Sequence, residues 1–462
     1  MTTREMLLAR GLMFAPFSGI QIDLNVVNKR LPDGRIVSAD VCDHNCTTKF
    51  GDYLCGSAFT LNHGLKAVFA SGESIVQRVE TGRKGLLLAQ EYFLEHLFER
   101  YCRDFAIPPE VASAIVDLLQ EEICEVNLFG GNPEMHREIL WIISMLKSLG
   151  FRVNLTTTGR KFFRPDFVEN FSADPPHLLA LSMDNFDPDQ LEKVFTMPLD
   201  ELYDVWKKTN KLAGQTQKFL EGVYAARLIR EKGIKTAVLF NMVLHRQNIR
   251  HIQLALQMIK RHLPDALINP YPAQDSFLDE KDRDLNKRFS EEDLLVFGNL
   301  VNFFLKETLA GNPNLTKRIQ YWLVLKAALN TAKNSWEAAK FLAGNGLWKC
   351  YRHPGAGIYL QIGKSNPNHP ILEGLEPGGY PGCYWQNTTT VLPEQVDSSA
   401  QIAGFVMNGM QRLAQESCSR CPGCNMPRLW FNMISTELGL DPEKQPNLVS
   451  EYLRLRKIFV GF

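Results

Sequence analysis

The sequence lacks a long apolar run, since no stretch approaches the roughly 18–20 residues that a membrane-spanning helix requires. It also lacks net charge, because Lys plus Arg and Asp plus Glu both number 51. A formal charge of zero argues against a protein that depends on neutralising phosphates. The chain has no internal repeat, no low-complexity tract and no convincing signal for secretion. We therefore expect a cytoplasmic protein that binds neither membranes nor nucleic acid.

What the chain has is a large apolar fraction, 45% of 462 residues, which excludes wholesale disorder. This length suits two to three domains, or one large α/β barrel with an appendage. Ten cysteines in a cytosolic chain are more consistent with metal ligands or buried thiols than with disulfides. Eight of them form two groups, at 42–55 and 350–424. Cys102 and Cys124 stand alone in apolar segments, so we expect them in the core.

The hydrophobic pattern alternates between strands and helices over most of the chain. Such alternation predicts a parallel sheet with right-handed crossovers, either open or curled into a barrel. Helices are expected over about 64–122, with Leu94, Leu97, Phe98 and Tyr101 on a buried face, over about 198–232, near 252–263 and from 291 to about 343. The strands are expected at 19–24, 35–41, 125–129, 151–156, 178–184, 236–243 and 266–270.

Three cysteines, Cys42, Cys46 and Cys55, follow the segment 35–41, so we expect their loop at the carboxyl end of a strand of the sheet. Three thiolates can hold three irons of a 4Fe–4S cluster and leave the fourth open to a ligand. They can equally form part of a zinc site with His44 or His63 as a fourth donor, or be unrelated core residues. The spacing alone leaves these interpretations open.

A second group, Cys418, Cys421 and Cys424, has the spacing with which successive thiolates bind one metal centre. Cys350 and Cys383 can supply the remaining ligands. The surrounding stretch, 344–430, is rich in glycine and proline, so a metal would help to hold it together. A structural zinc knot is the alternative.

Polar and glycine-rich segments follow several of the expected strands: Gly130-Gly131-Asn132-Pro133-Glu134, Thr157-Thr158-Gly159, and Ser182 with Asp184. Taken singly, each is an ordinary turn or strand end. In parallel sheets, however, ligands bind at the carboxyl ends of the strands. The coincidence of these segments with the cysteine loop predicts a ligand site at that edge.

In combination, the motifs resemble the radical S-adenosylmethionine (SAM) superfamily, and the C-terminal region is similar to its SPASM/twitch subgroup. The resemblance implies a partial (β/α)6 TIM-like barrel with a helical insertion at 56–122 and a C-terminal cysteine-rich iron–sulfur region. It divides the chain into an N-terminal extension (1–35), the barrel (36–275), a helical connection (276–345), an auxiliary iron–sulfur region (346–430) and a tail (431–462).

The resemblance also implies site residues. Cys42, Cys46 and Cys55 would bind a 4Fe–4S cluster whose open iron is chelated by SAM. An auxiliary 4Fe–4S cluster would take its ligands from Cys350, Cys383, Cys418, Cys421 and Cys424. Two departures are evident: eight residues separate Cys46 from Cys55 where the family has two, and Asn132 stands where the family has glutamate. The residues implied to bind SAM are Leu54, Gly130, Gly131, Asn132, Glu134, Thr157, Thr158, Ser182, Asp184 and Asn241.

The implied activity is reductive cleavage of SAM to a 5′-deoxyadenosyl radical, which abstracts hydrogen from a peptide or small-molecule substrate. An electron donor such as flavodoxin or ferredoxin would be a partner. Two other hypotheses are a non-catalytic zinc-binding α/β interaction protein and an iron–sulfur electron-transfer protein without SAM chemistry.

Overall fold

The computed structural model describes the central α/β part of the chain and several outlying segments. The described residues are 18–24, 26–30, 36–40, 71–104, 109–120, 125–129, 132–183, 186, 188–209, 214–245, 248–272, 290–311, 319–335, 337–338, 358–362, 398–415 and 446–460.

Seven parallel strands form the main sheet, in the order β8-β7-β6-β5-β4-β1-β9. Six of them, β1 and β4 to β8, are neighbours in chain order, as predicted for a parallel α/β sheet. The five predicted strands between 125 and 270 are confirmed, each within two residues of its expected bounds. The strands are β1 (Ser18–Asp23), β4 (Glu125–Phe129), β5 (Arg152–Thr157), β6 (Leu178–Ser182), β7 (Ala237–Leu244), β8 (Leu267–Pro272) and β9 (Ile358–Ile362).

The strand that precedes the first cysteines is not part of this sheet, which corrects our expectation. β2 (Val26–Arg30) and β3 (Ile36–Asp40) form a separate antiparallel pair, with Arg30 opposite Ile36. The connection between them is too short for a parallel crossover, so the two strands can pair only as a hairpin. β1 is the strand that joins the parallel sheet, although it lies in the segment 1–35 that we assigned to an extension. The other domain boundaries stay a prediction.

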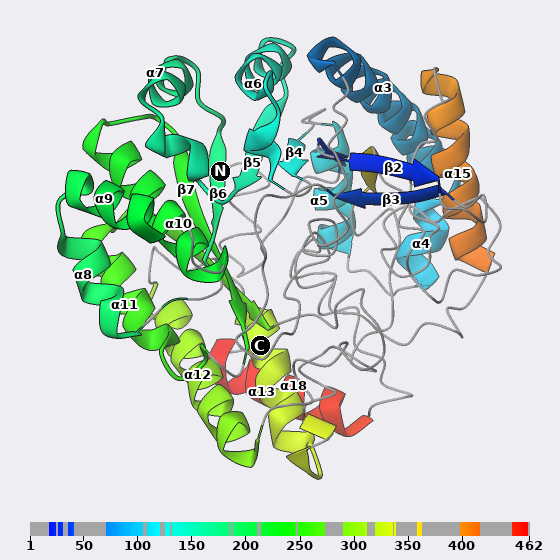
Figure 1. Ribbon diagram of the computed structural model, residues 1–462. Coiled ribbons are helices and arrows are strands. Elements are labelled where there is room, and N and C mark those ends of the chain that lie inside the picture. The colour runs from blue at the N-terminus through cyan, green and yellow to red at the C-terminus, as the bar shows by residue number, and fades with distance from the viewer. Residues whose placement is uncertain are drawn as a thin grey trace.

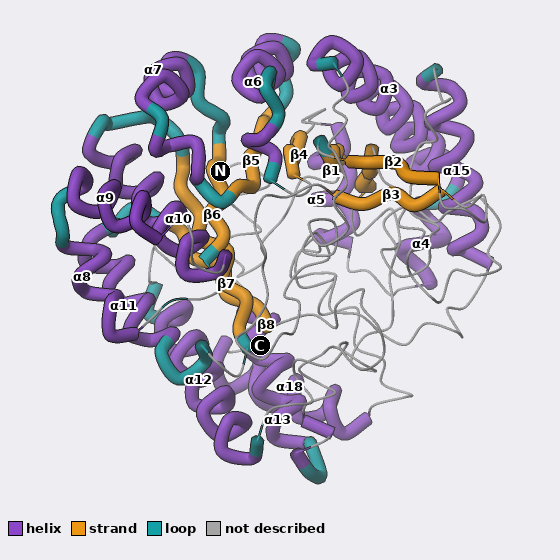
Figure 2. The backbone as a smooth tube through the Cα atoms, viewed as in Figure 1, coloured by secondary structure: helices purple, strands orange, loops and turns teal. Residues whose placement is uncertain are grey.

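Helices lie along the outer side of the strands and follow an arc around them (Figure 1, Figure 2). The expected helical stretches are present, with the acidic first turn of α12 closed by a capping box between Ser290 and Asp293. The helices are α3 (Gly72–His96), α4 (Phe98–Asp104), α5 (Pro109–Gln120), α6 (Ile139–Ser148), α7 (Pro165–Ala173), α8 (Leu191–Thr196), α9 (Leu199–Thr209), α10 (Gly214–Glu231), α11 (Ile252–His262), α12 (Glu291–Leu309), α13 (Ile319–Thr331), α15 (Ser399–Gln415) and α18 (Pro446–Val460).

One predicted helix face is interrupted. α3 ends at His96 and α4 begins at Phe98, so the spacing that runs through Leu94 and Leu97 crosses a break. Leu94, Leu97 and Phe98 are half-buried against the core. The deeper face of α3 lies earlier, around Val79 and Leu86, which are at most 1% exposed.

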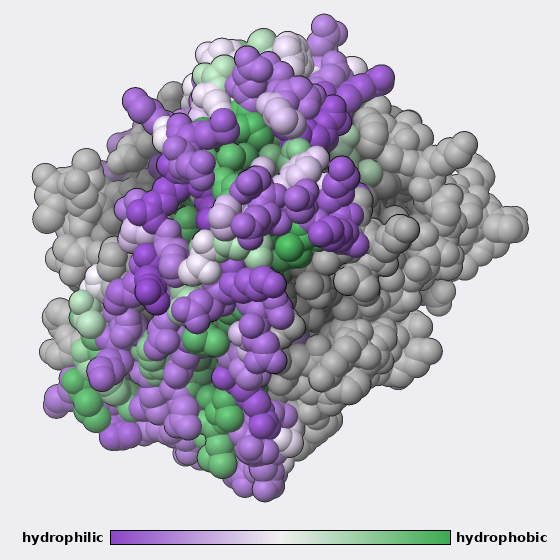
Figure 3. All heavy atoms as spheres, turned by 60° about the vertical axis from the view of Figure 1, so that its left-hand side comes forward, coloured by the Kyte–Doolittle hydropathy of each residue, from purple (hydrophilic) through white to green (hydrophobic). Residues whose placement is uncertain are grey.

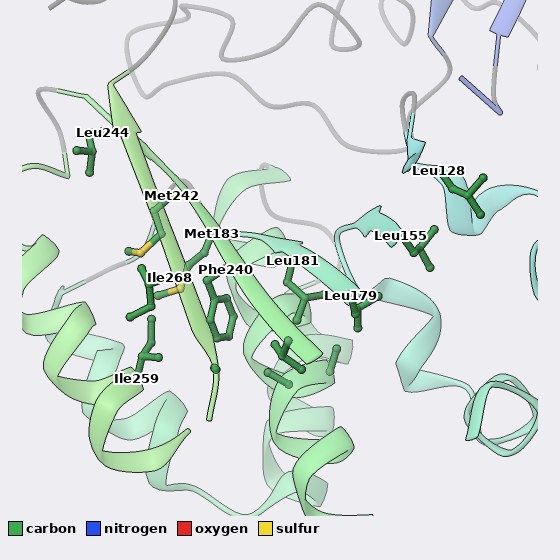
Figure 4. Close-up of a cluster of buried hydrophobic side chains, with 14 of the residues drawn as sticks. Leu128, Leu155, Leu179, Leu181, Met183, Phe240, Met242, Leu244, Ile259 and Ile268 are labelled. Carbon is green, nitrogen blue, oxygen red and sulfur yellow. The ribbon is translucent and has the colours of Figure 1, made fainter. Parts of the chain in front are cut away.

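The core lies between the sheet and the helices. Phe240, Met242 and Leu244 of β7 are fully buried and lie on the side of Ile259 from α11 (Figure 4). Burying each such side chain contributes about 1.5–3 kcal/mol. Because side chains alternate along a strand, Asn241 lies on the opposite face of β7. The sheet therefore has one apolar face under the helices and a second, inner face that carries polar residues.

Two elements from the cysteine-rich region 346–430 belong to this fold, which the sequence did not indicate. β9 pairs with β1 in parallel, with Ser18 opposite Ile358. α15 packs along α3, where an added Cβ at Gly85 would lie only 2.5 Å from Ile402 Cβ. The C-terminal segment is thus joined to the N-terminal edge of the sheet at two places.

The outer face formed by the helices carries mostly hydrophilic side chains with hydrophobic ones between them (Figure 3). Leu295 on α12 is the most exposed of the large hydrophobic residues described, at 71%. Within the described segments, no helix combines the length and apolar character needed to cross a bilayer.

Candidate functional site at the carboxyl edge of the sheet

Four of the predicted site residues meet where β4 and β5 end. Thr157 donates a hydrogen bond through Oγ1 to Asn132 Oδ1 at 2.9 Å. Asn132 Nδ2 donates to Thr158 Oγ1 at 3.2 Å and to Glu134 Oε1 at 3.1 Å. Thr158 Oγ1 in turn donates to Glu134 Oε1 at 3.2 Å. The structure therefore joins the segment after β4 to the turn after β5, as the common sheet edge predicts.

Local sequence explains both turns. Pro133 begins a short 3-10 helix, Pro133–Met135, because its fixed φ suits a first helical position. Gly159 follows β5 with φ of +90°, a conformation that costs other residues strain. An added Cβ there would lie 2.9 Å from both Glu221 O and Ala225 Cβ of α10. Gly159 thus allows the chain to turn and lets α10 approach closely.

These four side chains are almost fully buried: Asn132 and Glu134 are each 1% exposed, Thr157 3% and Thr158 4%. Much of their hydrogen bonding is directed at each other and at the turn backbone, since Glu134 Oε1 also accepts from Arg160 N at 2.7 Å. Hydrogen bonds between buried polar groups rigidify a structure. The arrangement can hold the two strand ends, and the backbone groups between them, in a fixed relation.

A buried carboxylate that sequence reasoning missed lies beside this turn. Glu221 of α10 is 0% exposed and accepts a hydrogen bond from Trp206 Nε1 at 3.0 Å. Arg160 Nε lies 3.9 Å from the same oxygen. A carboxylate out of water requires such partners. No motif marks Glu221 in the sequence, because its partners come from other segments of the chain.

Aromatic rings pack next to this carboxylate. Phe163 stacks between Trp206 and Tyr224, with centroid distances of 4.1 and 3.9 Å and interplanar angles of 9° and 15°. Phe162 and Phe163 are 1% and 4% exposed. Both rings therefore belong to the hydrophobic core.

A second polar group lies on the inner face across β6, β7 and β8. Ser182 is opposite Asn241, and Asn241 is opposite Asn269, in the parallel register. Asn269 Nδ2 donates to Asn241 Oδ1 at 2.8 Å. Asn269, which the motifs did not indicate, is 7% exposed. An isolated asparagine in a strand carries no recognisable spacing, so only the register reveals it.

The turn after β7 is closed by Asn248. Its Oδ1 accepts from His245 N at 2.9 Å, and its Nδ2 donates to Val243 O at 2.6 Å. The segment before α11 is tied to α12, because Arg250 Nη2 donates to Asp293 Oδ1 at 3.0 Å. Burial raises the pKa of Asp293, but hydrogen bonds from Ser290 and Arg250 outweigh it and hold that pKa below its usual value. This side of the edge is thus also fixed.

The predicted site residues therefore fall into two groups in the described structure. Asn132, Glu134, Thr157 and Thr158 are in mutual contact, whereas Ser182 and Asn241 belong to the row across β6 to β8. Among the residues described, no set of three or more His, Cys, Asp or Glu side chains is arranged to hold a metal. The remaining predicted residues lie outside the described ones and stay predictions: Leu54, Gly130, Gly131, Asp184, Cys42, Cys46, Cys55, Cys350, Cys383, Cys418, Cys421 and Cys424.

Cys102 is the one cysteine within the described residues. It is half-buried against the core, and burial raises the pKa of its thiol. Cys102 therefore packs against the core, as predicted, but is only partly buried. Cys124 lies outside the described residues.

Comparison with known proteins gives distant likenesses only. No family model matches the chain, and no curated protein matches it. Among solved structures, native anSMEcpe with bound AdoMet and Cp18Cys peptide aligns with a TM-score of 0.43 and 12% identity, over 96% of this chain and 97% of that one. Streptococcus suis SuiB bound to precursor peptide SuiA aligns with a TM-score of 0.46 and 12% identity, over 92% and 73%. Since these scores are below 0.5, the function has to be argued from the residues of the chain itself.

Proposed function

We propose that this chain is a radical SAM enzyme that uses SAM and a 4Fe–4S cluster to abstract hydrogen from a peptide or small-molecule substrate. The order of the sequence motifs and the six parallel strands in chain order support this proposal. The observation that carries it is the hydrogen bond from Thr157 to Asn132. It brings two separate motifs, the segment after Gly130-Gly131 and the Thr-Thr-Gly turn, to one sheet edge.

In this proposal Cys42, Cys46 and Cys55 hold the cluster that receives SAM. When bound, the cluster supplies the electron that cleaves the sulfonium and so generates the radical. The thiol donors fit an iron–sulfur centre, since three thiolates leave one iron open. All three lie outside the described residues, so the ligand set rests on their spacing.

The described residues fit an adenosyl ligand in one further respect. Asn269 Oδ1 is buried and accepts no hydrogen bond within the described structure. A buried acceptor of this kind is costly unless a ligand or water completes it. The row of Ser182, Asn241 and Asn269 is uncharged, which suits the neutral hydroxyl and ring groups of a nucleoside.

The network around Glu134 has a different role in the proposal. Its members hold the backbone of 132–134 and 157–160 in place, so that backbone groups face the ligand without reorganisation. Gly130 and Gly131 would let the backbone approach the cofactor closely. Glu134 and Asn132 would act mainly by positioning, because their side chains bond to the turn after β5.

The auxiliary region completes the proposal. Cys383, Cys418 and Cys421, with Cys350 or Cys424, would bind a second 4Fe–4S cluster that contacts substrate or accepts an electron from it. β9 and α15 lie between these cysteines in sequence and are joined to β1 and α3. A redox partner such as flavodoxin or ferredoxin would supply electrons to the first cluster.

Metal analysis of anaerobically purified and reconstituted protein tests the cluster assignment. We expect about eight irons and as many sulfides per chain from two 4Fe–4S clusters. A C42A/C46A/C55A variant and a C418A/C421A/C424A variant should each lose about half of the iron. Zinc bound in place of iron, in a colourless protein, would overturn the proposal in favour of a zinc-binding interaction protein.

A further inference from the structure

The amide groups of Asn241 and Asn269 are the feature from which we draw a further inference. Asn241 Oδ1 is occupied, because it accepts the hydrogen bond from Asn269 Nδ2 at 2.8 Å. This fixes the amide plane of Asn241 and turns its Nδ2 away from β8. No described residue accepts a hydrogen bond from that Nδ2 group. The Nδ2 group of Asn241 is therefore a donor held in one orientation and able to bond to a ligand.

Asn269 offers the complementary group, a hydrogen-bond acceptor. Its Oδ1 is buried and lacks a hydrogen-bond partner within the described structure, while the residue is 7% exposed. Leaving a buried acceptor unsatisfied costs about 1–3 kcal/mol. Such a cost in the middle of a sheet is explained if a ligand completes the bond.

The position and the charge of these residues restrict the chemical class of the ligand group. Ser182, Asn241 and Asn269 occupy one register row on the inner face, and the apolar residues Phe240, Met242 and Ile268 lie on the helix side (Figure 4). All three members of the row are neutral, so nothing in it compensates a charged ligand group. A hydroxyl group is neutral and offers an acceptor beside a donor.

We propose that Asn269 is a positioning residue that makes Asn241 a hydrogen-bond donor to a neutral hydroxyl group of the ligand. This inference rests on the proposed function, in which the ligand is SAM. The resemblance assigned Asn241 to SAM binding without saying which of its atoms acts, and it did not include Asn269.

Two Asn→Asp variants, at positions 269 and 241, should both weaken ligand binding. In Asn269→Asp the new carboxylate can only accept, so the Asn241 amide turns round and presents Oδ1 to the ligand. In Asn241→Asp the bond from Asn269 is kept, but the second carboxylate oxygen faces the ligand. In both variants the atom of residue 241 that faces the ligand is a hydrogen-bond acceptor instead of a donor. A purely structural role predicts little loss of binding in either variant, because each keeps the hydrogen bond between the two side chains.

The test is equilibrium binding by calorimetry, with reconstituted full-length protein and two probes, S-adenosyl-L-homocysteine and 5′-deoxyadenosine. Each Asp variant should bind both probes about tenfold more weakly or worse. The near-isosteric Asn241→Leu and Asn269→Leu variants test the same bonds without a buried charge. Asn170→Asp, on the exposed side of α7, is the control and should bind like the wild type. Circular dichroism confirms that each protein compared is folded.

The outcomes are separable. Weaker binding of both probes places the acceptor in the neutral nucleoside and supports the inference. Weaker binding of the first probe alone places it in the charged amino-acid part and overturns the inference. Wild-type affinity in all four variants overturns it and leaves the proposed function standing. Failure of the wild type to bind either probe overturns both.

Discussion

Glu134 accepts a hydrogen bond through Oε1 from the backbone N–H of Arg160 at 2.7 Å, and so connects the ends of two neighbouring strands. The same oxygen accepts from Asn132 and Thr158. A single buried carboxylate thus organises the candidate site, two residues after Asn132.

Removing the Glu134 carboxylate should destabilise the carboxyl edge of the sheet. Glu134→Ala leaves three donors without their acceptor, and we expect a loss of about 2–4 kcal/mol in the free energy of unfolding. Urea denaturation followed by circular dichroism measures it. Glu134→Gln keeps an acceptor oxygen and should recover part of the loss. Glu169→Ala on the exposed face of α7 is the control. A Glu134→Ala protein as stable as this control would contradict the role assigned to the network.

Two glycines with positive φ separate conformational strain from packing. An added Cβ at Gly150, which has a φ of +81°, would meet nothing within 4 Å. An added Cβ at Gly159, which has a φ of +90°, would lie 2.9 Å from Glu221 O. Gly150→Ala should therefore cost about 1–2 kcal/mol from backbone strain alone. Gly159→Ala should cost clearly more in the same unfolding assay, because α10 also has to shift. Equal losses would show that α10 does not approach the turn as described.

The contact between α3 and α15 can be tested with another matched pair. An added Cβ at Gly85 would lie 2.5 Å from Ile402 Cβ, whereas one at Gly404 would meet nothing within 4 Å. Gly85→Ala should destabilise the protein and raise amide hydrogen exchange in α15. Gly404→Ala should stabilise it by up to about 1 kcal/mol, because alanine favours the helix. Unchanged exchange in the Gly85→Ala protein would refute this packing.

A pH dependence is expected from the contact between α13 and α18. Hydrogen bonds from Arg454 and Asn330 lower the pKa of Glu451 from 4.5 to about 2. A carboxyl with a lowered pKa stabilises the fold above its unfolded pKa and loses that effect as pH falls through the folded value. Glu451→Gln should therefore be less stable than wild type at pH 7, and the difference should shrink between pH 4.5 and about 2. A difference that is constant over this interval would rule out the ionised pair as its cause.

The sequence predicted the parallel sheet well, because strands such as 125–129 and 178–182 are apolar runs with clear turn residues after them. It also placed Asn132 and Thr157 at one edge, since parallel strands share their carboxyl ends. It missed β2 and its pairing with β3, because Val26-Val-Asn-Lys-Arg30 is short and has only two apolar residues, so it lacks a clear strand pattern. Contacts between distant segments, such as Gly85 with Ile402 and Asn241 with Asn269, leave no periodic signal in a sequence and appear only once the chain is folded.

The most direct measurement of the central claim is formation of 5′-deoxyadenosine from SAM by anaerobically reconstituted protein with dithionite. The matched control is a Cys42/Cys46/Cys55→Ala variant, which retains the C-terminal cysteines. We expect the wild type to form 5′-deoxyadenosine and the variant to form none. No product from wild-type protein with a full iron content would contradict radical SAM chemistry and favour an electron-transfer role.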